Sequence, residues 1–335
     1  MPTSFCALPQ TTIRLQADPL LGFESLRILA HGQADHPSRN DGVPLDHRPR
    51  SLVELLDALA RDGHGVILTM GKGGVGKTTV AAAIALELAR RGLRVPLSTT
   101  EPAAHVVATV KALQPFPGLS IDRIDPALET ARYAAEGMSR AGSDLDPSGE
   151  TLLAEDLRSP CTAKIAFIPV FAQAFAQGHD RIVVLDTAPT GHTILLLDAA
   201  LAYHREVTCQ LLEMSPAVKQ LLLRLHDPIN ARILLVTVPE ATPVHEAAQR
   251  QRDLQLAQIE PYGWVINQSL TPLVIRDPSL KQRQQQESHF IREVLTQHAL
   301  RTALIPWCPE PPVGERGLRD LLKPIASSFY FVNQE

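Results

Sequence analysis

Residues 65–79, GVILTMGKGGVGKTT, constrain the fold of this chain more than any other stretch of the sequence. The apolar run at 66–70 predicts a buried strand, and the alanine- and leucine-rich run at 80–91 predicts a helix. Between them the glycines and lysines fit G-x-x-x-x-G-K-[ST], the pattern of a phosphate-binding loop. We therefore expect a strand, a loop and a helix that present backbone N–H groups and a positive helix N-terminus to a nucleotide.

Each residue type in this loop has a chemical reason to be there. Lys77 is expected to contact the β- and γ-phosphates, and the hydroxyl of Thr78 is expected to ligate Mg²⁺. Glycine avoids a Cβ that would obstruct a left-handed turn or the approach of a phosphate. With ATP and Mg²⁺ as the expected cofactors, the predicted nucleotide contacts are Gly71, Lys72, Gly73, Gly74, Val75, Gly76, Lys77, Thr78 and Thr79.

The rest of the chain alternates strands and helices as an α/β protein does, which predicts a doubly wound parallel sheet. Ligands bind at the carboxyl ends of the strands in such a sheet. Asp186 ends a strand at 181–186 and is expected to hold Mg²⁺ opposite Thr78, and Glu101 follows a strand at 93–99. Other strands are expected at 119–124, 232–238, 263–267 and 302–307, and other helices at 51–61, 243–259 and 279–296.

Three regions define the expected domain organisation. Residues 1–50 are rich in Pro, His, Asp and Gly and predict a flexible segment, residues 51–330 form the ATPase domain, and residues 111–177 form a helical insertion within it. PLLGFESLRIL at 19–29 matches PPVGERGLRDL at 311–321 at a constant offset. This match predicts the tail of a preceding copy of the domain, with coincidence between two short amphipathic helices as the alternative.

Composition excludes several classes of protein. The net charge is −4 and no basic tract occurs, which argues against binding to nucleic acid or to an anionic membrane surface. No apolar run has the length of a membrane span, and the N-terminus lacks a basic region followed by an apolar core, so we expect a cytosolic protein. The four cysteines are far apart in the sequence, so reduced thiols are expected.

The phosphate loop resembles that of the arsenical pump-driving ATPases, and so do DTAPTGHT at 186–193, EDLRSPCT at 155–162 and GWVINQSL at 263–270. The resemblance extends from about residue 51 to about residue 325, and it is closest to the C-terminal one of that family's two fused halves. It implies a dimeric ATPase class with a deviant phosphate loop, in which Lys72 reaches across an interface to the partner's nucleotide. A homodimer, or pairing with a separate first ATPase half, is therefore expected; a merely solvated Lys72 is the alternative.

The resemblance also implies roles for residues outside the loop. Glu101 stands where the family usually has Asp, as the acid that helps with Mg²⁺ and the attacking water. Its longer side chain displaces the carboxylate by about one C–C bond, and errors of that size cost about a hundredfold in rate. Asn267 takes the adenine-contacting position, with a polar cap on a strand end as the alternative.

The metalloid ligands that the resemblance implies for As(III) or Sb(III) are Cys161 and His192. Cys161 lies at a predicted helix start, where the helix dipole favours the thiolate that a soft metalloid requires. The resemblance further implies that the segment 186–193 is the switch that transmits the nucleotide state to this site. A buried or capping cysteine and a histidine that only orders the turn are the alternatives.

Function is implied by the same resemblance: a cytoplasmic ATPase that energises efflux of arsenite or antimonite through a membrane pump, and associates with the inner membrane through that pump. The same motifs are expected of a natural single half and of a piece of a longer protein. One alternative is a nucleotide-binding partner or regulatory half that is inactive alone. Another is a targeting ATPase for tail-anchored membrane proteins, disfavoured because the chain has no C-x-x-C pair and only four methionines.

Overall fold

A computed structural model describes residues 22–31, 49–99, 115–124, 126–141, 155, 168–187, 221, 223–299 and 301–323. Within these residues a seven-stranded sheet has the order β3-β2-β4-β1-β5-β6-β7, and every neighbouring pair is parallel. The predicted parallel α/β sheet is thereby confirmed. Its strands are β1 (Gly65–Met70), β2 (Val95–Thr99), β3 (Leu119–Arg123), β4 (Ile182–Asp186), β5 (Ala231–Thr237), β6 (Gly263–Ser269) and β7 (Thr302–Pro306).

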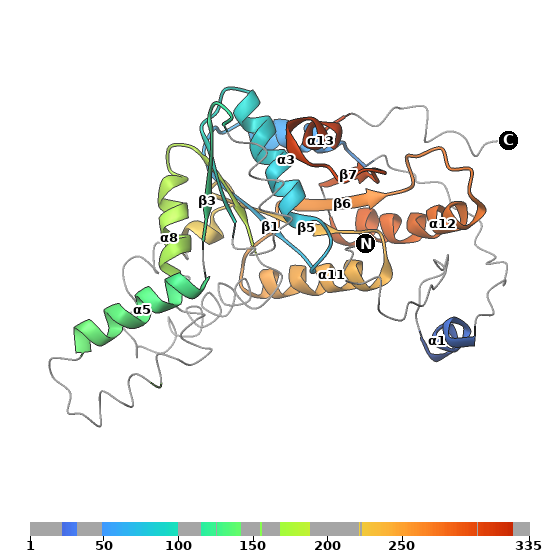
Figure 1. The fold of residues 1–335 in the computed structure, drawn as a ribbon, viewed down its shortest axis with the longest axis horizontal. Coiled ribbons are helices and arrows are strands. Elements are labelled where there is room, and N and C mark those ends of the chain that lie inside the picture. Colours follow the sequence, from blue (N-terminus) through green and yellow to red (C-terminus); the bar gives the residue numbers. More distant parts are fainter. Residues whose placement is uncertain are drawn as a thin grey trace, which may run out of the picture.

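Helices cover both faces of this sheet, as Figure 1 shows for α3 on one side and α11 on the other. One face carries α2 (Leu52–Leu59), α3 (Lys77–Arg90) and α13 (Gly314–Asp320). The other carries α8 (Ile168–Gln177), α11 (Ala241–Leu256) and α12 (Pro278–Glu293), which continues as a π-helical turn (Val294–His298). Helix α5 (Pro126–Ala141) follows β3 and extends away from the sheet in Figure 1.

The central strands are buried along their whole length because helices lie on both faces. In β1, Val66 and Leu68 contribute to the core under α8 and α11, whereas Ile67 contributes to the core under α3. This is the alternation of side chains expected of a strand. The connection from β1 runs through α3 toward β2, while β5, β6 and β7 extend on the other side of β1. The carboxyl end of β1 therefore lies where ligands bind in open α/β sheets.

The strands and helices expected from the sequence are present, with ends that shift by a few residues. Strand β3, inside the stretch expected as an insertion, is an edge strand paired with β2. Helices α5 and α8 also lie in that stretch. The predicted helix 51–61 is α2, and Ser51 Oγ accepts the N–H of Glu54 at 3.3 Å as its cap. The domain boundaries themselves stay a prediction.

The short repeat near the N-terminus forms helix α1 (Gly22–His31). Gly22 begins α1 with a φ of +81°, and the matching Gly314 begins α13 with a φ of +69°. The paired leucines differ in environment: Leu318 is fully buried against the domain, whereas Leu26 is exposed. The two helices share a starting geometry, and the origin of α1 in a preceding copy of the domain stays a prediction.

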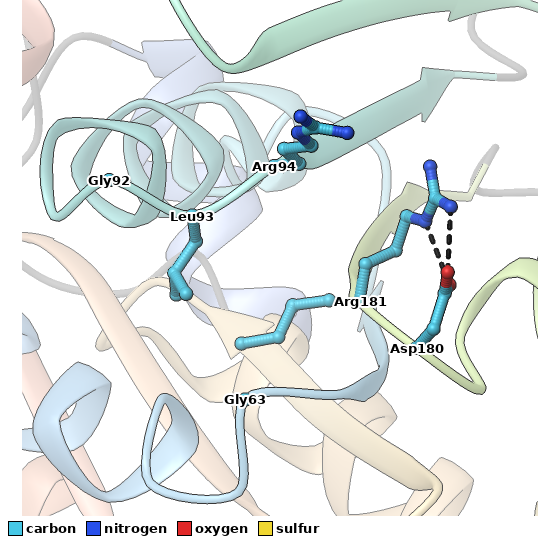
Figure 2. A pocket seen from close by; sticks show the side chains of 7 residues that line it. Gly63, Gly92, Leu93, Arg94, Asp180 and Arg181 are labelled. Atoms are coloured by element: carbon cyan, nitrogen blue, oxygen red, sulfur yellow. Dashed lines mark hydrogen bonds and ion pairs between the residues drawn. The ribbon is translucent and has the colours of Figure 1, made fainter.

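The edge of the sheet opposite the phosphate loop carries a pocket of about 250 Å³ (Figure 2). It is lined by residues that precede β1, β2 and β4, among them Gly63, Arg94 and Arg181. Arg181 is already held by two hydrogen bonds to Asp180, at 2.8 and 2.9 Å (Figure 2). Among the helices described, none combines the length and the apolar character needed to cross a membrane.

Candidate nucleotide-binding site

The phosphate loop connects β1 to α3 and owes its path to two glycines. Gly71 has a φ of +155°, and a Cβ there would lie 2.2 Å from the carbonyl oxygen of Val236. Gly76 caps α3 in the left-handed region with a φ of +89°, and a Cβ there would lie 2.2 Å from Nδ2 of Asn267. Because both residues are glycine, the backbone of the loop can pack closely against β5 and β6, and a side chain at either position would prevent this.

A pair of alanine substitutions tests this packing. Gly76→Ala is expected to lower the free energy of unfolding by about 1–3 kcal/mol and to weaken nucleotide binding, because it combines a left-handed backbone with a displaced Asn267. Gly74→Ala is the matched control: its φ of +84° is similar, but a Cβ there would have no atom within 4 Å. Denaturant unfolding compares the two, and equal losses of stability in both variants would contradict the packing argument.

Lys77 lies inside the loop, at the first residue of α3. Its side chain is buried, and its Nζ donates a hydrogen bond to the carbonyl oxygen of Lys72 at 2.9 Å. Helix α3 has no side-chain cap at its N-terminus, so its first N–H groups are not used by a capping side chain. The loop thus brings an ammonium group and a helix N-terminus together, as phosphate binding requires.

Asp186 lies beside the loop as the last residue of β4, and three threonine hydroxyls donate to its carboxylate. Thr78 Oγ1 donates to Oδ2 at 2.6 Å, and Thr99 Oγ1 donates to the same oxygen at 2.9 Å. Thr69 Oγ1 donates to Oδ1 at 3.3 Å. These hydroxyls come from α3, β2 and β1. The expected proximity of Thr78 and Asp186 is therefore present.

The environment of this carboxylate is nearly dry. Burial raises the pKa of Asp186, while the three threonine hydroxyls and the nearby Lys77 oppose the rise. Hydroxyl and carboxylate oxygens are the ligand types that Mg²⁺ prefers, so Thr78 and Asp186 fit the ion that the sequence predicts. Bound there, Mg²⁺ would neutralise charge on the β- and γ-phosphate oxygens.

Lys72 points away from its own loop toward helix α11. Its Nζ lies 2.8 Å from Oε1 of Glu246, and both side chains are partly exposed, at 38% and 40%. A half-exposed ion pair of this kind contributes about 0–1 kcal/mol, so it can open at little cost. The predicted action of Lys72 on a second nucleotide would require this opening.

Asn267, the predicted adenine contact, lies in β6, two residues before the strand ends, and is buried. Its Nδ2 donates to the carbonyl oxygen of Val75 at 2.9 Å, so the amide braces the phosphate loop. The turn after it is bonded to Glu287 of α12, whose Oε2 accepts the N–H of Leu270 at 2.8 Å. The structure thus brings β6 to the loop, and the adenine contact stays a prediction.

The buried Glu287 predicts a pH dependence of stability. Burial raises its pKa from 4.5 to about 7, against the opposing effect of its hydrogen bonds to residues 269–271. Between these values the folded protein keeps a proton that the unfolded chain has lost. The contribution to the free energy of unfolding, about 3 kcal/mol for a shift of this size, is complete below pH 4.5 and is lost as the pH rises through about 7.

Urea unfolding at about pH 5 and about pH 8 measures this contribution. The wild-type chain is expected to lose more stability over this range than Glu287→Gln, which is neutral at both pH values. Identical pH profiles for the two proteins would contradict the raised pKa.

Three predicted site residues, Glu101, Cys161 and His192, lie outside the described residues. Among the residues that are described, no group of three or more His, Cys, Asp or Glu could hold a metal ion. Cys308 is a free, half-buried thiol whose pKa is raised chiefly by burial. The predicted metalloid ligands therefore stay a prediction.

Sequence reasoning missed two of the hydroxyl donors to Asp186. Thr69 and Thr99 are both register partners of Asp186, on β1 and β2 respectively. The sequence does show each of them at or near the end of an expected strand. What it does not show is that β4 lies between β1 and β2, which is the fact that brings the three side chains together.

Comparison with known proteins adds sequence similarity to this geometry. Residues 64–220, which include the phosphate loop and Asp186, match the family model described as anion-transporting ATPase. Over this stretch the chain is similar in sequence to the anion-transporting ATPases. It is 45% identical over 324 residues to an arsenical pump-driving ATPase of Escherichia coli, and 44% identical over 329 residues to one of Acidiphilium multivorum. Each alignment covers 96% of this chain and 55% of the relative.

The chain thus spans about half the length of these curated relatives. A more distant relative from Aquifex aeolicus, 26% identical over 291 residues, is matched over 96% of its own length. Proteins about the size of one such ATPase domain therefore occur among the relatives as well as longer ones.

Proposed function

We propose that this chain is a Mg²⁺-dependent ATPase whose hydrolysis energises efflux of arsenite or antimonite through a membrane pump. The observation that carries the proposal is the hydrogen bond of 2.6 Å between Thr78 of the phosphate loop and Asp186 at the end of β4. It joins the two groups that a phosphoryl-transfer site needs for its metal ion. The printed names of the relatives, arsenical pump-driving ATPases, support the transport part of the proposal.

The side chains act in this proposal as their positions suggest. Lys77 exchanges its bond to the Lys72 carbonyl for the phosphates, which the N–H groups of the loop also bind. Thr78 and Asp186 hold Mg²⁺, and Glu101 orients the attacking water. Asn267 contacts the adenine from the end of β6.

Lys72 has a different role, because it supplies positive charge to the nucleotide of a partner. Charge supplied in this way stabilises the transition state of phosphoryl transfer. A homodimer or a complex with a separate ATPase half follows from this role. The protein would be cytoplasmic and would reach the inner membrane through its pump.

One observation favours the second candidate, a regulatory half that binds nucleotide but is inactive alone. Lys72 is paired with Glu246 of the same chain, which keeps its charge from any partner until the pair opens. Nucleotide binding without turnover, relieved by a partner half, would identify this candidate.

Cys161 and His192 are the proposed ligands for As(III) or Sb(III). A trivalent metalloid prefers three soft ligands, so a site made of cysteines from two paired chains is expected rather than a site within one. In this arrangement metalloid binding favours pairing, and pairing brings Lys72 to the partner's nucleotide.

Steady-state ATP hydrolysis by the reduced chain, with and without antimonite, tests this proposal. We expect antimonite to stimulate turnover and Cys161→Ser to abolish the stimulation. Cys308→Ser is the matched control, since this half-buried thiol should leave the stimulation intact. Stimulation that survives Cys161→Ser would remove this cysteine from the metalloid site.

A further inference from the structure

The turn after β6 bears directly on the phosphate loop. Asn267 Nδ2 donates to the Val75 carbonyl at 2.9 Å and occupies the space beside Gly76. Gln268 follows with a φ of +57°, an uncommon conformation for a residue other than glycine. Gln268 lies at an irregularity in the pairing of β6 with β7, between Ile266 and Ser269, so the position of Asn267 depends on what holds the chain in this conformation.

The carboxylate of Glu287, on α12, accepts hydrogen bonds from backbone N–H groups and side-chain hydroxyls of residues 269–271. Its Oε2 accepts the N–H groups of Leu270 and Thr271, at 2.8 and 3.1 Å. The same oxygen accepts the hydroxyls of Ser269 and Thr271, at 3.0 and 3.2 Å. A buried carboxylate is costly unless hydrogen bonds satisfy it, so this side chain and the turn depend on each other.

Gln284, one helical turn before Glu287, binds the carbonyl groups of the same turn. Its Nε2 lies 2.6, 3.1 and 2.8 Å from the carbonyl oxygens of Leu270, Thr271 and Leu273. Helix α12 thus holds both the donors and the acceptors of residues 269–273. Two side chains on one face of a helix give the turn a fixed position relative to the sheet.

We propose that Glu287 is a positioning residue for nucleotide binding, which fixes the turn after β6 and so holds Asn267 against the phosphate loop. The inference rests on the proposed function, and it adds to the nucleotide-binding site a residue that lies on a helix outside the loop. Glu287 acts only through Asn267. Without the carboxylate, the N–H of Leu270 loses its acceptor, the N–H of Thr271 keeps only Ser269 Oγ at 3.2 Å, and the brace on Val75 loosens.

Mg²⁺–ATP titration by calorimetry tests this inference with three variants. Glu287→Ala is expected to weaken ATP binding about tenfold, the size of one lost hydrogen bond. Glu287→Gln keeps an acceptor oxygen at the same position and should recover most of the affinity. Asn267→Ala should weaken binding at least as much, since it removes the proposed adenine contact as well as the brace, and adding Glu287→Ala to it should cause no further loss.

This lack of additivity separates a positioning role from a general loss of stability, which would weaken the double variant further. Unchanged affinity in Glu287→Ala, or additive losses in the double variant, would overturn the inference while leaving the proposed function intact. Failure of the wild-type chain to bind ATP would instead overturn the proposed function itself. Melting temperatures of all variants show that the titrated proteins are folded.

Discussion

Replacing Lys72 by alanine is expected to lower ATP turnover about a thousandfold while leaving ATP binding nearly unchanged. Turnover falls because a positive charge supplied to the transition state is lost. Binding survives because the substitution keeps the backbone carbonyl of Lys72, which accepts the hydrogen bond from Lys77. Steady-state hydrolysis and a separate binding titration measure the two effects. Glu246→Gln is the control, since it opens the ion pair with Lys72 but keeps the lysine, and it should not lower turnover.

Mixing two inactive variants tests whether Lys72 acts on a partner's nucleotide. Lys72→Ala and Asp186→Asn are each expected to be inactive alone. A mixed dimer has one complete site, with the carboxylate from one chain and the lysine from the other. Equal mixtures should therefore regain about a quarter of the wild-type rate, since about half of randomly formed dimers are mixed. No recovery would mean that Lys72 acts within its own chain or not at all.

Replacing Asp186 by asparagine is expected to lower turnover about a hundredfold or more and to raise the Mg²⁺ concentration needed for hydrolysis. Asparagine removes a buried negative charge and one of the two oxygens that accept threonine hydroxyls. The amide nitrogen of the asparagine is a donor, and it would face hydroxyls that in the wild-type protein donate to the carboxylate.

Thr99→Val is the matched control for this substitution. It removes one hydrogen bond to Asp186 but keeps the carboxylate, so its loss of turnover should be nearer tenfold. Hydrolysis rates over a range of Mg²⁺ concentrations measure both variants. An Asp186→Asn protein with the Mg²⁺ dependence of the wild type would contradict the assignment of this carboxylate to the metal ion.

The phosphate loop and the parallel sheet could be predicted because local patterns specify them. Glycine spacing, the apolar run of β1 and the alanine-rich face of α3 are all read within about thirty residues of sequence. Lys77, Thr78 and Asp186 come together as predicted because Asp186 ends β4, while Lys77 and Thr78 begin the helix that follows the loop after β1.

The contacts between distant segments could not be predicted. Thr69 and Thr99 reach Asp186 only because β4 lies between β1 and β2, and no local pattern sets that order. Glu246 and Glu287 occur in polar helices whose other charged residues are exposed or only partly buried. Their partners, Lys72 and the turn after β6, lie far from them in sequence or on another element. Periodicity predicts burial, but it does not predict which buried carboxylate binds which turn.

ATP turnover by the pure chain, measured over a range of chain concentrations, tests the proposed function most directly. Because Lys72 is proposed to complete the site of a second copy, the rate per chain should rise with concentration and then level off as dimers form. Bound ATP with no turnover at any concentration would contradict a self-sufficient ATPase and would favour the regulatory half.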